Sequence, residues 1–338
     1  MRGAAIFLGL CSAAGVVATP ILAQQGDRPS RECVREIVKL CGRDRSQIPM
    51  CLTEKSSELS DGCKAELRVR AQARTAGQTS SVPATSSISY GPHERQAIDF
   101  YAANGLSNSP ALVLFIHGGG WSFGNHQTTV QQKPDHFTSL EYAFASTGYR
   151  LMPDTPVEGQ AADIGAAIRA LRDQAPTLGF DPDQIVLIGH SAGAHLAALV
   201  STDPQYAGDA MSAIQGVILL DGAGYDIASS MQQATPRSRQ LYDRVFGDDP
   251  ERQAALSPAN HAGAPDAPNW LILFVEERDK ARAQSNLLAS RLKDAGVSSN
   301  AVSISNTDHG RMNREIGTEA GARQTQAIDA FLQQIFDN

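Results

Sequence analysis

The sequence predicts an α/β fold with a mostly parallel central sheet and helices on both faces. Short apolar runs rich in Val, Ile and Leu recur from about residue 90 onward, at 111–116, 185–188, 214–220, 271–275 and 301–304. Stretches with helical spacing lie among them, at about 160–175, 191–201, 281–295 and 319–335. Continuous apolar strands that alternate with helices are typical of a parallel sheet buried on both faces.

Length and charge limit the classes of function. The chain has 338 residues, of which 42% are hydrophobic, enough for one sizeable core and a small second unit. Its formal net charge is -7, and no basic stripe suited to a phosphate backbone is present. We therefore expect no nucleic-acid partner.

The first 23 residues resemble a secretory signal peptide. Arg2 precedes an apolar run over residues 4–17, and Ile21-Leu22-Ala23 before Gln24 fits a signal-peptidase site. Glycine and proline interrupt the run, and no charged stop-transfer cluster follows it, which favours cleavage over a membrane anchor. Cys11 would leave with this segment. We expect a secreted or periplasmic protein with no membrane span after cleavage.

The four remaining cysteines are clustered. Behind a secretory signal, an even and clustered set predicts two disulfides formed in an oxidising compartment. A zinc site is disfavoured because the spacing is not that of a zinc knuckle and no His accompanies the cysteines. Sequence alone leaves all three pairings open. The four candidates are Cys33, Cys41, Cys51 and Cys63.

The segment 24–75 that holds these cysteines is predicted to be helical. It resembles the cysteine-rich repeat of Golgi-apparatus-protein-1 type in Cys51-Leu52, Leu59-Ser60 and Cys63. The resemblance implies a small helical hairpin that depends on its disulfides, and a candidate binding module for a protein partner. Residues 76–89 have the composition of a flexible linker, which places the larger domain at 90–338.

A candidate nucleophile follows the predicted strand 185–188. That strand leads into Gly189-His190-Ser191-Ala192-Gly193 and then into a helical stretch. A serine at a sharp strand-to-helix turn, flanked by glycines, is the general G-x-S-x-G elbow of serine hydrolases. The following helix N-terminus favours developing negative charge. Ser191 is therefore the predicted nucleophile.

A glycine run predicts an oxyanion hole. The strand 111–116 ends in His117-Gly118-Gly119-Gly120-Trp121, and glycines after a buried strand leave backbone N–H groups accessible. A phosphate loop would need a following Lys-Ser/Thr, which is absent. The predicted donors are the N–H groups of Gly119, Gly120 and Ala192. His117 is interpreted as a structural residue of the loop.

The base and the acid are expected after the nucleophile in chain order. His309, which follows the predicted strand 301–304, is the preferred base. It is preferred to His195, in the helix behind the elbow, and to His261, in the insertion 222–262. For the acid we favour Asp279, a few residues beyond the strand 271–275. The disfavoured alternatives are Asp221 at the end of strand 214–220, Glu276, Glu277 and Asp308.

Together these motifs resemble the α/β-hydrolase superfamily. The match lies in His117–Trp121, Tyr149-Arg150-Leu151, Gly189–Gly193, Asp279 and His309-Gly310, and covers about residues 90–338. The nearest groups are the hormone-sensitive lipases, kynurenine formamidases and feruloyl-esterase-like enzymes. The lipases usually carry an N-terminal helical cap, whereas this chain has the cysteine segment and linker there.

The hypothesis is therefore a serine hydrolase that cleaves short-chain or aryl carboxylic esters through an acyl-enzyme, with no metal or organic cofactor. Trp121 and Phe123 either line an apolar pocket or pack internally. The long stretch 222–262, with a helical piece at 237–246, is a candidate lid or pocket wall. The alternatives are an arylformamidase-like amide hydrolase and a non-catalytic binding protein on the same fold. The second is disfavoured because nucleophile, base, acid and glycines are all present.

Overall fold

The computed structural model describes residues 30–42, 52, 55, 58–67, 82–105, 109–263 and 265–336. The chain divides into two compact units, Met1–Arg74 and Thr75–Asn338. The predicted signal peptide, Cys51 and residues 76–81 of the predicted linker lie outside the described residues. Within the described part, no helix is both long and apolar enough to cross a bilayer.

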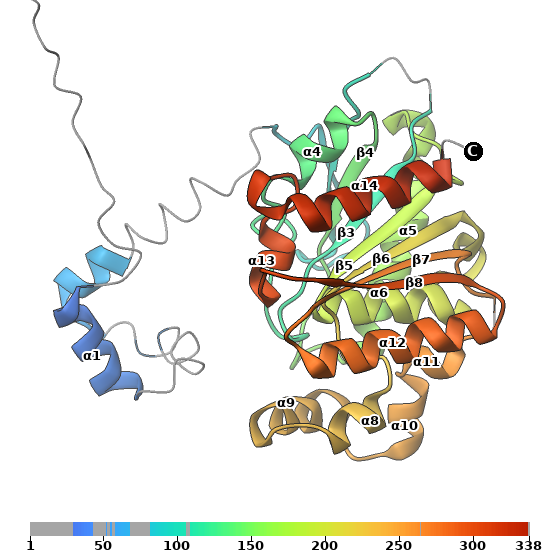
Figure 1. Cartoon of the computed structure of the whole chain (residues 1–338). Coiled ribbons are helices and arrows are strands. Elements are labelled where there is room, and N and C mark those ends of the chain that lie inside the picture. The colour runs from blue at the N-terminus through green and yellow to red at the C-terminus, as the bar shows by residue number, and fades with distance from the viewer. Residues whose placement is uncertain are drawn as a thin grey trace, which may run out of the picture. The chain divides into compact units, whose positions relative to one another are not determined.

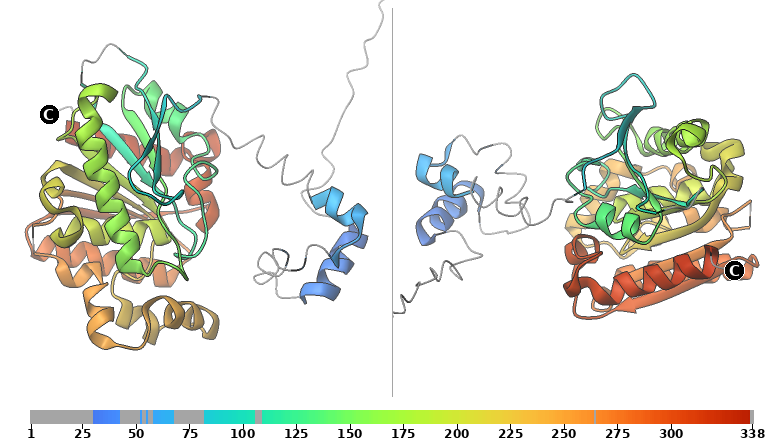
Figure 2. Two further views of the ribbon diagram at one scale, coloured as in Figure 1. Left: turned by 180° about the vertical axis from the view of Figure 1, so that it is seen from behind. Right: turned by 90° about the horizontal axis from the view of Figure 1, so that it is seen from above.

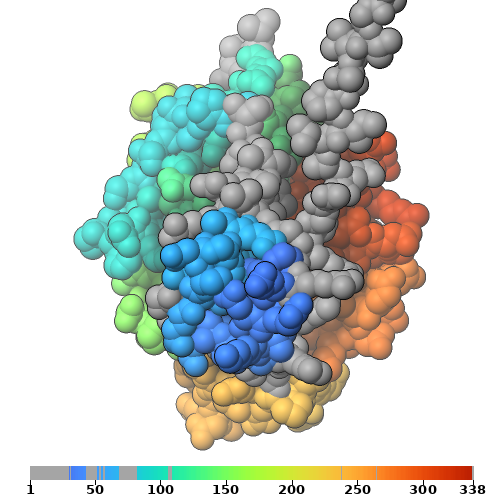
Figure 3. All heavy atoms as spheres, turned by 90° about the vertical axis from the view of Figure 1, so that its left-hand side faces the viewer, coloured from blue at the N-terminus to red at the C-terminus, as the bar shows by residue number. Residues whose placement is uncertain are grey.

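In the part of the first unit that the structure describes, a disulfide joins helix α1 (Arg31–Cys41) to a second helix. Helix α1 and this second helix, over 61–67, form one packed body in the space-filling view (Figure 3). Cys33 and Cys63 form the disulfide, and both are buried together with Ile37 and Leu59. Cys41 is also disulfide-bonded. The prediction of disulfides in a helical segment is thus confirmed, with one pairing now assigned.

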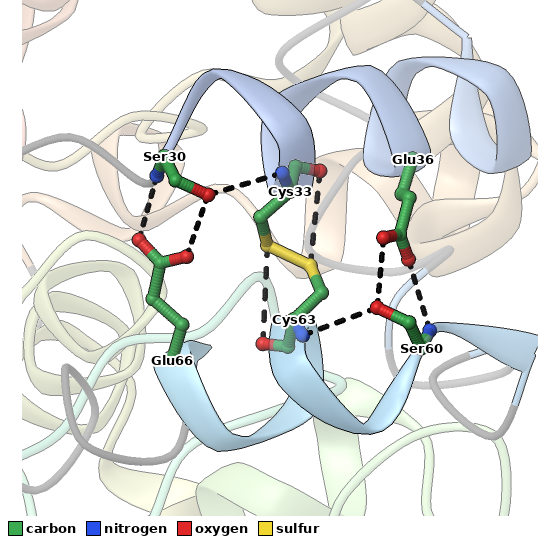
Figure 4. The surroundings of a disulfide bond; sticks show 6 residues. All are labelled: Ser30, Cys33, Glu36, Ser60, Cys63 and Glu66. Atoms are coloured by element: carbon green, nitrogen blue, oxygen red, sulfur yellow. Dashed lines mark hydrogen bonds between the residues drawn. A yellow bond between two sulfur atoms is a disulfide. The ribbon is translucent and has the colours of Figure 1, made fainter.

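Each of these helices is capped by a carboxylate of the other (Figure 4). Glu66 accepts from the backbone N–H of Ser30 at 2.6 Å and from its hydroxyl at 2.8 Å. Glu36 accepts the matching pair from Ser60, at 2.9 and 2.7 Å. Both serine hydroxyls also accept the N–H three residues on, which is the usual N-cap arrangement. The hydrogen bonds from Ser60 lower the pKa of Glu36.

The second unit is built on one eight-stranded sheet (Figure 1). The strand order is β1-β2-β4-β3-β5-β6-β7-β8; β1, β2 and β4 pair antiparallel, and all strands from β4 to β8 are parallel. The strands are β1 (Ser86–Ser89), β2 (Ala97–Tyr101), β3 (Leu112–Ile116), β4 (Ala143–Thr147), β5 (Ile185–His190), β6 (Ile214–Leu220), β7 (Asn269–Val275) and β8 (Ser298–Ile304).

Helices cover both faces of this sheet, as the view from above shows (Figure 2). In β3, Leu112 and Leu114 point into one core and Val113 and Phe115 into the other, because side chains alternate along a strand. The first core is covered by α5 (Val157–Leu178), α6 (Ala192–Thr202) and α12 (Asp279–Asp294). The second is covered by α4 (Lys133–Ser139), α13 (His309–Arg314) and α14 (Ala322–Phe336). The predicted fold class is confirmed.

Two parts of the second unit differ in detail from the sequence prediction. Strand β1 falls inside the predicted linker 76–89, because Ile88 is buried and pairs with Ile98 although serines surround it. The stretch 222–262 forms four short helices after β6. They are α8 (Ile227–Gln232), α9 (Pro236–Phe246), α10 (Pro250–Ala255) and α11 (Pro258–His261).

Candidate active site

Ser191 lies at a strained turn between β5 and α6. Its φ of 56° and ψ of -116° are rare for a residue with a side chain, and such strain is typical of functional positions. Its N–H donates to the carbonyl of Leu220 at 3.0 Å, which fixes the turn to the next strand. A Cβ at Gly193 would lie 2.2 Å from the carbonyl oxygen of Ile116, and one at Gly189 would lie 2.4 Å from that of Gly193. Only glycines therefore allow this close packing.

The structure brings Ser191 and His309 together, as the sequence predicts. His309 is the first residue of α13, just past the end of β8, and its Nε2 lies 3.0 Å from Ser191 Oγ. Its Nδ1 lies 2.7 Å from a carboxylate oxygen of Asp221. Asp221 directly follows β6, so the three side chains meet at the carboxyl edge of the parallel strands, where ligands bind in such sheets.

The preferred acid, Asp279, is not at this position, and that prediction is wrong. Asp279 is the first residue of α12, its side chain is 89% exposed, and its carboxylate lies 3.5 Å from Arg282 Nη1. The physical reason is that the helix begins at residue 279. A carboxylate in a first helical turn interacts favourably with the helix dipole and with solvent. The disfavoured alternative, Asp221, contacts His309 instead.

Asp221 is held as a buried, ionised carboxylate. Its side chain is 0% exposed, and its Oδ1 accepts the backbone N–H of Val275 at 3.1 Å. Burial raises the pKa of Asp221, but the hydrogen bond from His309 and the charge of Arg278 more than offset this effect. The pKa of Asp221 therefore lies below its usual value, and the group is charged at neutral pH.

The glycine loop lies against the nucleophile. A Cβ on Gly118 would be 3.1 Å from the Cβ of Ser191. Gly119 has a φ of 130°, and its carbonyl accepts N–H groups from Ser122 and Phe123, so the loop closes on itself. Ala192 begins α6, where helix geometry leaves N–H groups without an intrahelical acceptor. These positions suit the predicted role of the loop and of Ala192 as hydrogen-bond donors.

A known family model matches the part of the chain that carries most of this site. The family model BD-FAE matches residues 98–292, more than half of the chain. This chain belongs to the BD-FAE family. The matched range includes Ser191, Asp221 and the glycine loop, and it ends before His309.

Two relatives of this BD-FAE chain are esterases by name. Esterase LipQ of Mycobacterium tuberculosis is 26% identical over 78% of this chain and 64% of its own length. The arylesterase of Saccharolobus solfataricus is 27% identical over 67% of this chain and 75% of its own length. Among solved structures, esterase B from Lactobacillus rhamnosis covers 81% of this chain and 94% of its own, with a TM-score of 0.62 and 22% identity. The structural likeness supports the α/β-hydrolase fold.

Two buried side chains of the BD-FAE domain, His117 and Tyr149, hold the glycine loop in place. The ring of His117 is fully buried and stacks on Tyr149 at 4.3 Å, and the Tyr149 hydroxyl donates to the His117 carbonyl at 2.8 Å. His117 Nδ1 lies 2.8 Å from the carbonyl of Gly118. Burial lowers the pKa of His117 to about 4. This neutral, packed imidazole therefore serves as a structural part of the loop, in keeping with its interpretation from the sequence.

A second buried histidine joins the elbow to the insertion. Trp121 is only 4% exposed, and its Nε1 donates to Nδ1 of His195 at 3.3 Å. The other ring nitrogen of His195 donates to the carbonyl of Leu256 at 2.9 Å. Trp121 therefore packs internally. Phe123, by contrast, is 58% exposed beside the loop.

Helix α9 of the insertion lies beside the same loop. Leu241 would be 3.8 Å from a Cβ at Gly120, and the rings of Tyr242 and Phe246 pack on Trp121 at 6.3 and 5.0 Å. The expectation that this stretch forms a wall near the site fits these contacts. His261 lies elsewhere, with its Nε2 2.7 Å from the carbonyl of Ala255.

A third histidine fixes the backbone of His309. His190, the last residue of β5, donates through Nε2 to the carbonyl of His309 at 2.8 Å. Burial lowers the pKa of His190 to about 3, so its ring stays neutral. Neither the resemblance nor the spacing pointed to this role, although the position next to Ser191 could have suggested it. Among the described residues, no group of three or more His, Cys, Asp or Glu side chains could hold a metal ion.

Proposed function

We propose that this BD-FAE chain is a serine carboxylesterase that acts through Ser191, His309 and Asp221. The observation that carries the proposal is the continuous chain of contacts, 3.0 Å from Ser191 Oγ to His309 Nε2 and 2.7 Å from His309 Nδ1 to Asp221. A nucleophile, a base within hydrogen-bond reach and a group that orients the base are the requirements for covalent acyl transfer.

In the proposed reaction, Ser191 Oγ attacks the ester carbonyl and its proton passes to His309 Nε2. Asp221 accepts the Nδ1–H, which keeps the tautomer that leaves Nε2 free to act as a base. The oxyanion that forms is stabilised by the N–H groups of Gly119, Gly120 and Ala192, and the loss of one such donor costs on the order of 3 kcal/mol.

Collapse of this intermediate breaks the ester bond. The leaving alcohol takes the proton from His309 Nε2, and the acyl group stays on Ser191. Water then attacks the acyl-enzyme with His309 again as the base, which releases the carboxylic acid and restores the serine.

We favour a short-chain or aryl ester as the substrate. Support comes from the apolar side chains beside the glycine loop, namely the exposed Phe123 with Leu241 and Tyr242 of α9. The names of the relatives, an arylesterase among them, point the same way. A formamide substrate is the second candidate in the same chemistry, because one relative is named a kynurenine formamidase.

The test compares the wild-type chain with Ser191→Ala. We expect the wild type to react covalently with a fluorophosphonate probe and to hydrolyse p-nitrophenyl acetate, and the variant to do neither. Labelling that persists in the variant would contradict the nucleophile, and a wild type that is neither labelled nor active would favour a binding protein. Turnover of N-formylkynurenine well above that of every p-nitrophenyl ester would favour the amide reading.

We also propose export of the chain with cleavage after Ala23. The disulfides of the first unit support this, since such bonds persist in oxidising compartments. N-terminal sequencing of the protein recovered from culture medium and from periplasm should give Gln24 as the first residue. A chain that retains Met1 and stays in the reducing cytosol would contradict it.

A further inference from the structure

Arg278 touches both the acid and the base of the proposed triad. It precedes α12, and the turn that carries it is closed by its N–H, which donates to the carbonyl of Val275 at 3.0 Å. Its Nη1 contacts the same Asp221 oxygen that faces His309, and it lies 2.7 Å from His309 Nδ1. The side chain is 39% exposed, so the guanidinium spans from solvent to the buried carboxylate.

We infer that Arg278 is a positioning residue that keeps the carboxylate of Asp221 ionised and directed at His309. The inference rests on the proposed function and assigns a role that the family match and the triad geometry leave open.

The charge of Arg278 is needed because Asp221 is buried. A carboxylate removed from water favours its protonated form unless donors and positive charge compensate. Around Asp221, β7 supplies the N–H of Val275, α13 supplies His309, and the loop after β6 supplies the buried and neutral Tyr225. Arg278 supplies a permanent positive charge directly beside this carboxylate.

Hydrogen-bond roles lead to the same assignment. When His309 acts as a base, its Nδ1 carries a proton and is a donor, as is every nitrogen of Arg278. Two donors cannot bond to each other, so they share the Asp221 oxygen. A protonated Asp221 would lose both partners' attraction and would no longer hold the required tautomer. Two other titratable groups lie near Asp221, His309 and Arg278. His190 of β5 stays neutral, and the charge of Arg278 acts on Tyr242 of α9.

The experiment measures kcat/KM for p-nitrophenyl acetate from about pH 5 to about pH 9, with the full chain. The variants are Arg278→Gln, which keeps a donor without charge, and Arg278→Lys, which keeps the charge. Arg282→Gln is the matched control, because Arg282 lies one turn later and pairs with the exposed Asp279. Circular dichroism checks folding, and Arg278→Met is the second neutral variant if the Gln variant does not fold.

We expect the acid limb of the Arg278→Gln profile to move to higher pH by about one unit or more, because Arg278 is a positive charge beside both Asp221 and His309 and its loss favours proton binding there. Activity near the acid end would then fall about tenfold or more relative to the wild type, while the alkaline end changes far less. The limb is not assigned to a single residue, because neighbouring groups can share one apparent titration. Arg278→Lys should restore it, and Arg282→Gln should leave it in place.

An acid limb that stays in place in Arg278→Gln, whether activity is unchanged or falls equally at every pH, would overturn the inference. A limb that moves in Arg278→Lys as far as in Arg278→Gln would also overturn it, because charge would then not matter. Ser191→Ala measured alongside separates this from failure of the proposed function: turnover that persists there contradicts the nucleophile, whereas an unshifted limb contradicts only the role of Arg278.

Discussion

Replacement of His195 by Gln should make the protein less sensitive to acid. The ring of His195 is fully buried in α6 between Trp121 and Leu256. Burial lowers its pKa from 6.5 to about 4, although the hydrogen bond to Leu256 partly opposes this. In the unfolded chain the pKa returns to about 6.5. As the pH falls below about 6.5, His195 therefore binds a proton in the unfolded state but not in the folded state. The free energy of unfolding falls as a result, down to about pH 4.

The size of the effect follows from these two pKa values. Between about pH 8 and about pH 5, one histidine shifted in this way removes roughly 2 kcal/mol from the free energy of unfolding. That is a large part of the 5–15 kcal/mol or so that is typical of a domain. His195→Gln keeps a donor and an acceptor but does not titrate, so its stability should fall by about 2 kcal/mol less over the same pH interval.

Urea unfolding followed by tryptophan fluorescence at both pH values measures this difference. Carboxylates and other histidines contribute equally to wild type and variant, so they cancel in the comparison. His93 is exposed, so His93→Gln is the control for the loss of an imidazole that is not buried. Equal losses of stability in wild type and His195→Gln would refute the reasoning, whatever the variant's stability at pH 8.

Three further changes test the site and the first unit. Asp221→Asn should lower kcat by about 10³–10⁴-fold, because the imidazole loses its orienting carboxylate, whereas Asp279→Asn should stay within about twofold of the wild type. Equal effects of Asp221→Asn and Asp279→Asn on p-nitrophenyl acetate turnover would contradict the assignment of Asp221 as the acid of the site. Gly193→Ala should destabilise the domain by about 1–3 kcal/mol and reduce turnover, since its Cβ would lie 2.2 Å from a carbonyl oxygen of β3. An unchanged melting temperature would contradict the close contact between this turn and β3. Cys33→Ser with Cys63→Ser should remove about 3–4 kcal/mol of stabilisation from the first unit alone. Trypsin should then cut that unit rapidly while ester turnover persists; an unchanged cleavage rate would contradict it.

Sequence patterns predicted the strands that are mainly apolar. The runs that became β3, β5, β6 and β7 consist mostly of Val, Ile, Leu and Phe, whereas β8 was predicted from the shorter, mixed run 301–304. Strands β2 and β4 escaped prediction because each contains buried polar residues, Asp99 in one and Ser146 with Thr147 in the other. A hydrophobic pattern does not reveal a polar side chain that finds its partners within the fold.

Motifs predicted that Ser191 and His309 lie together, but they did not predict which aspartate contacts His309. Strands β6 and β7 both lead to an aspartate, and chain order alone does not tell which carboxylate reaches His309. The position at which α12 begins determines which aspartate contacts His309. Asp279 lies in the first turn of that helix and faces solvent, whereas Asp221 contacts the imidazole. A usable signal was present: an aspartate just before the predicted helix 281–295 is typical of a helix N-terminus.

The exchange of caps in the first unit makes its two helices mutually dependent. Each helix relies on a glutamate from the opposite one to bind its first serine, so neither has a complete N-terminus by itself. Order in this small unit therefore arises in both helices or in neither. Residues 30–36 and 60–66 share the pattern Ser-x-x-Cys-x-x-Glu, and the serine of each segment binds the glutamate of the other. The two segments therefore form matching halves on either side of the Cys33–Cys63 disulfide.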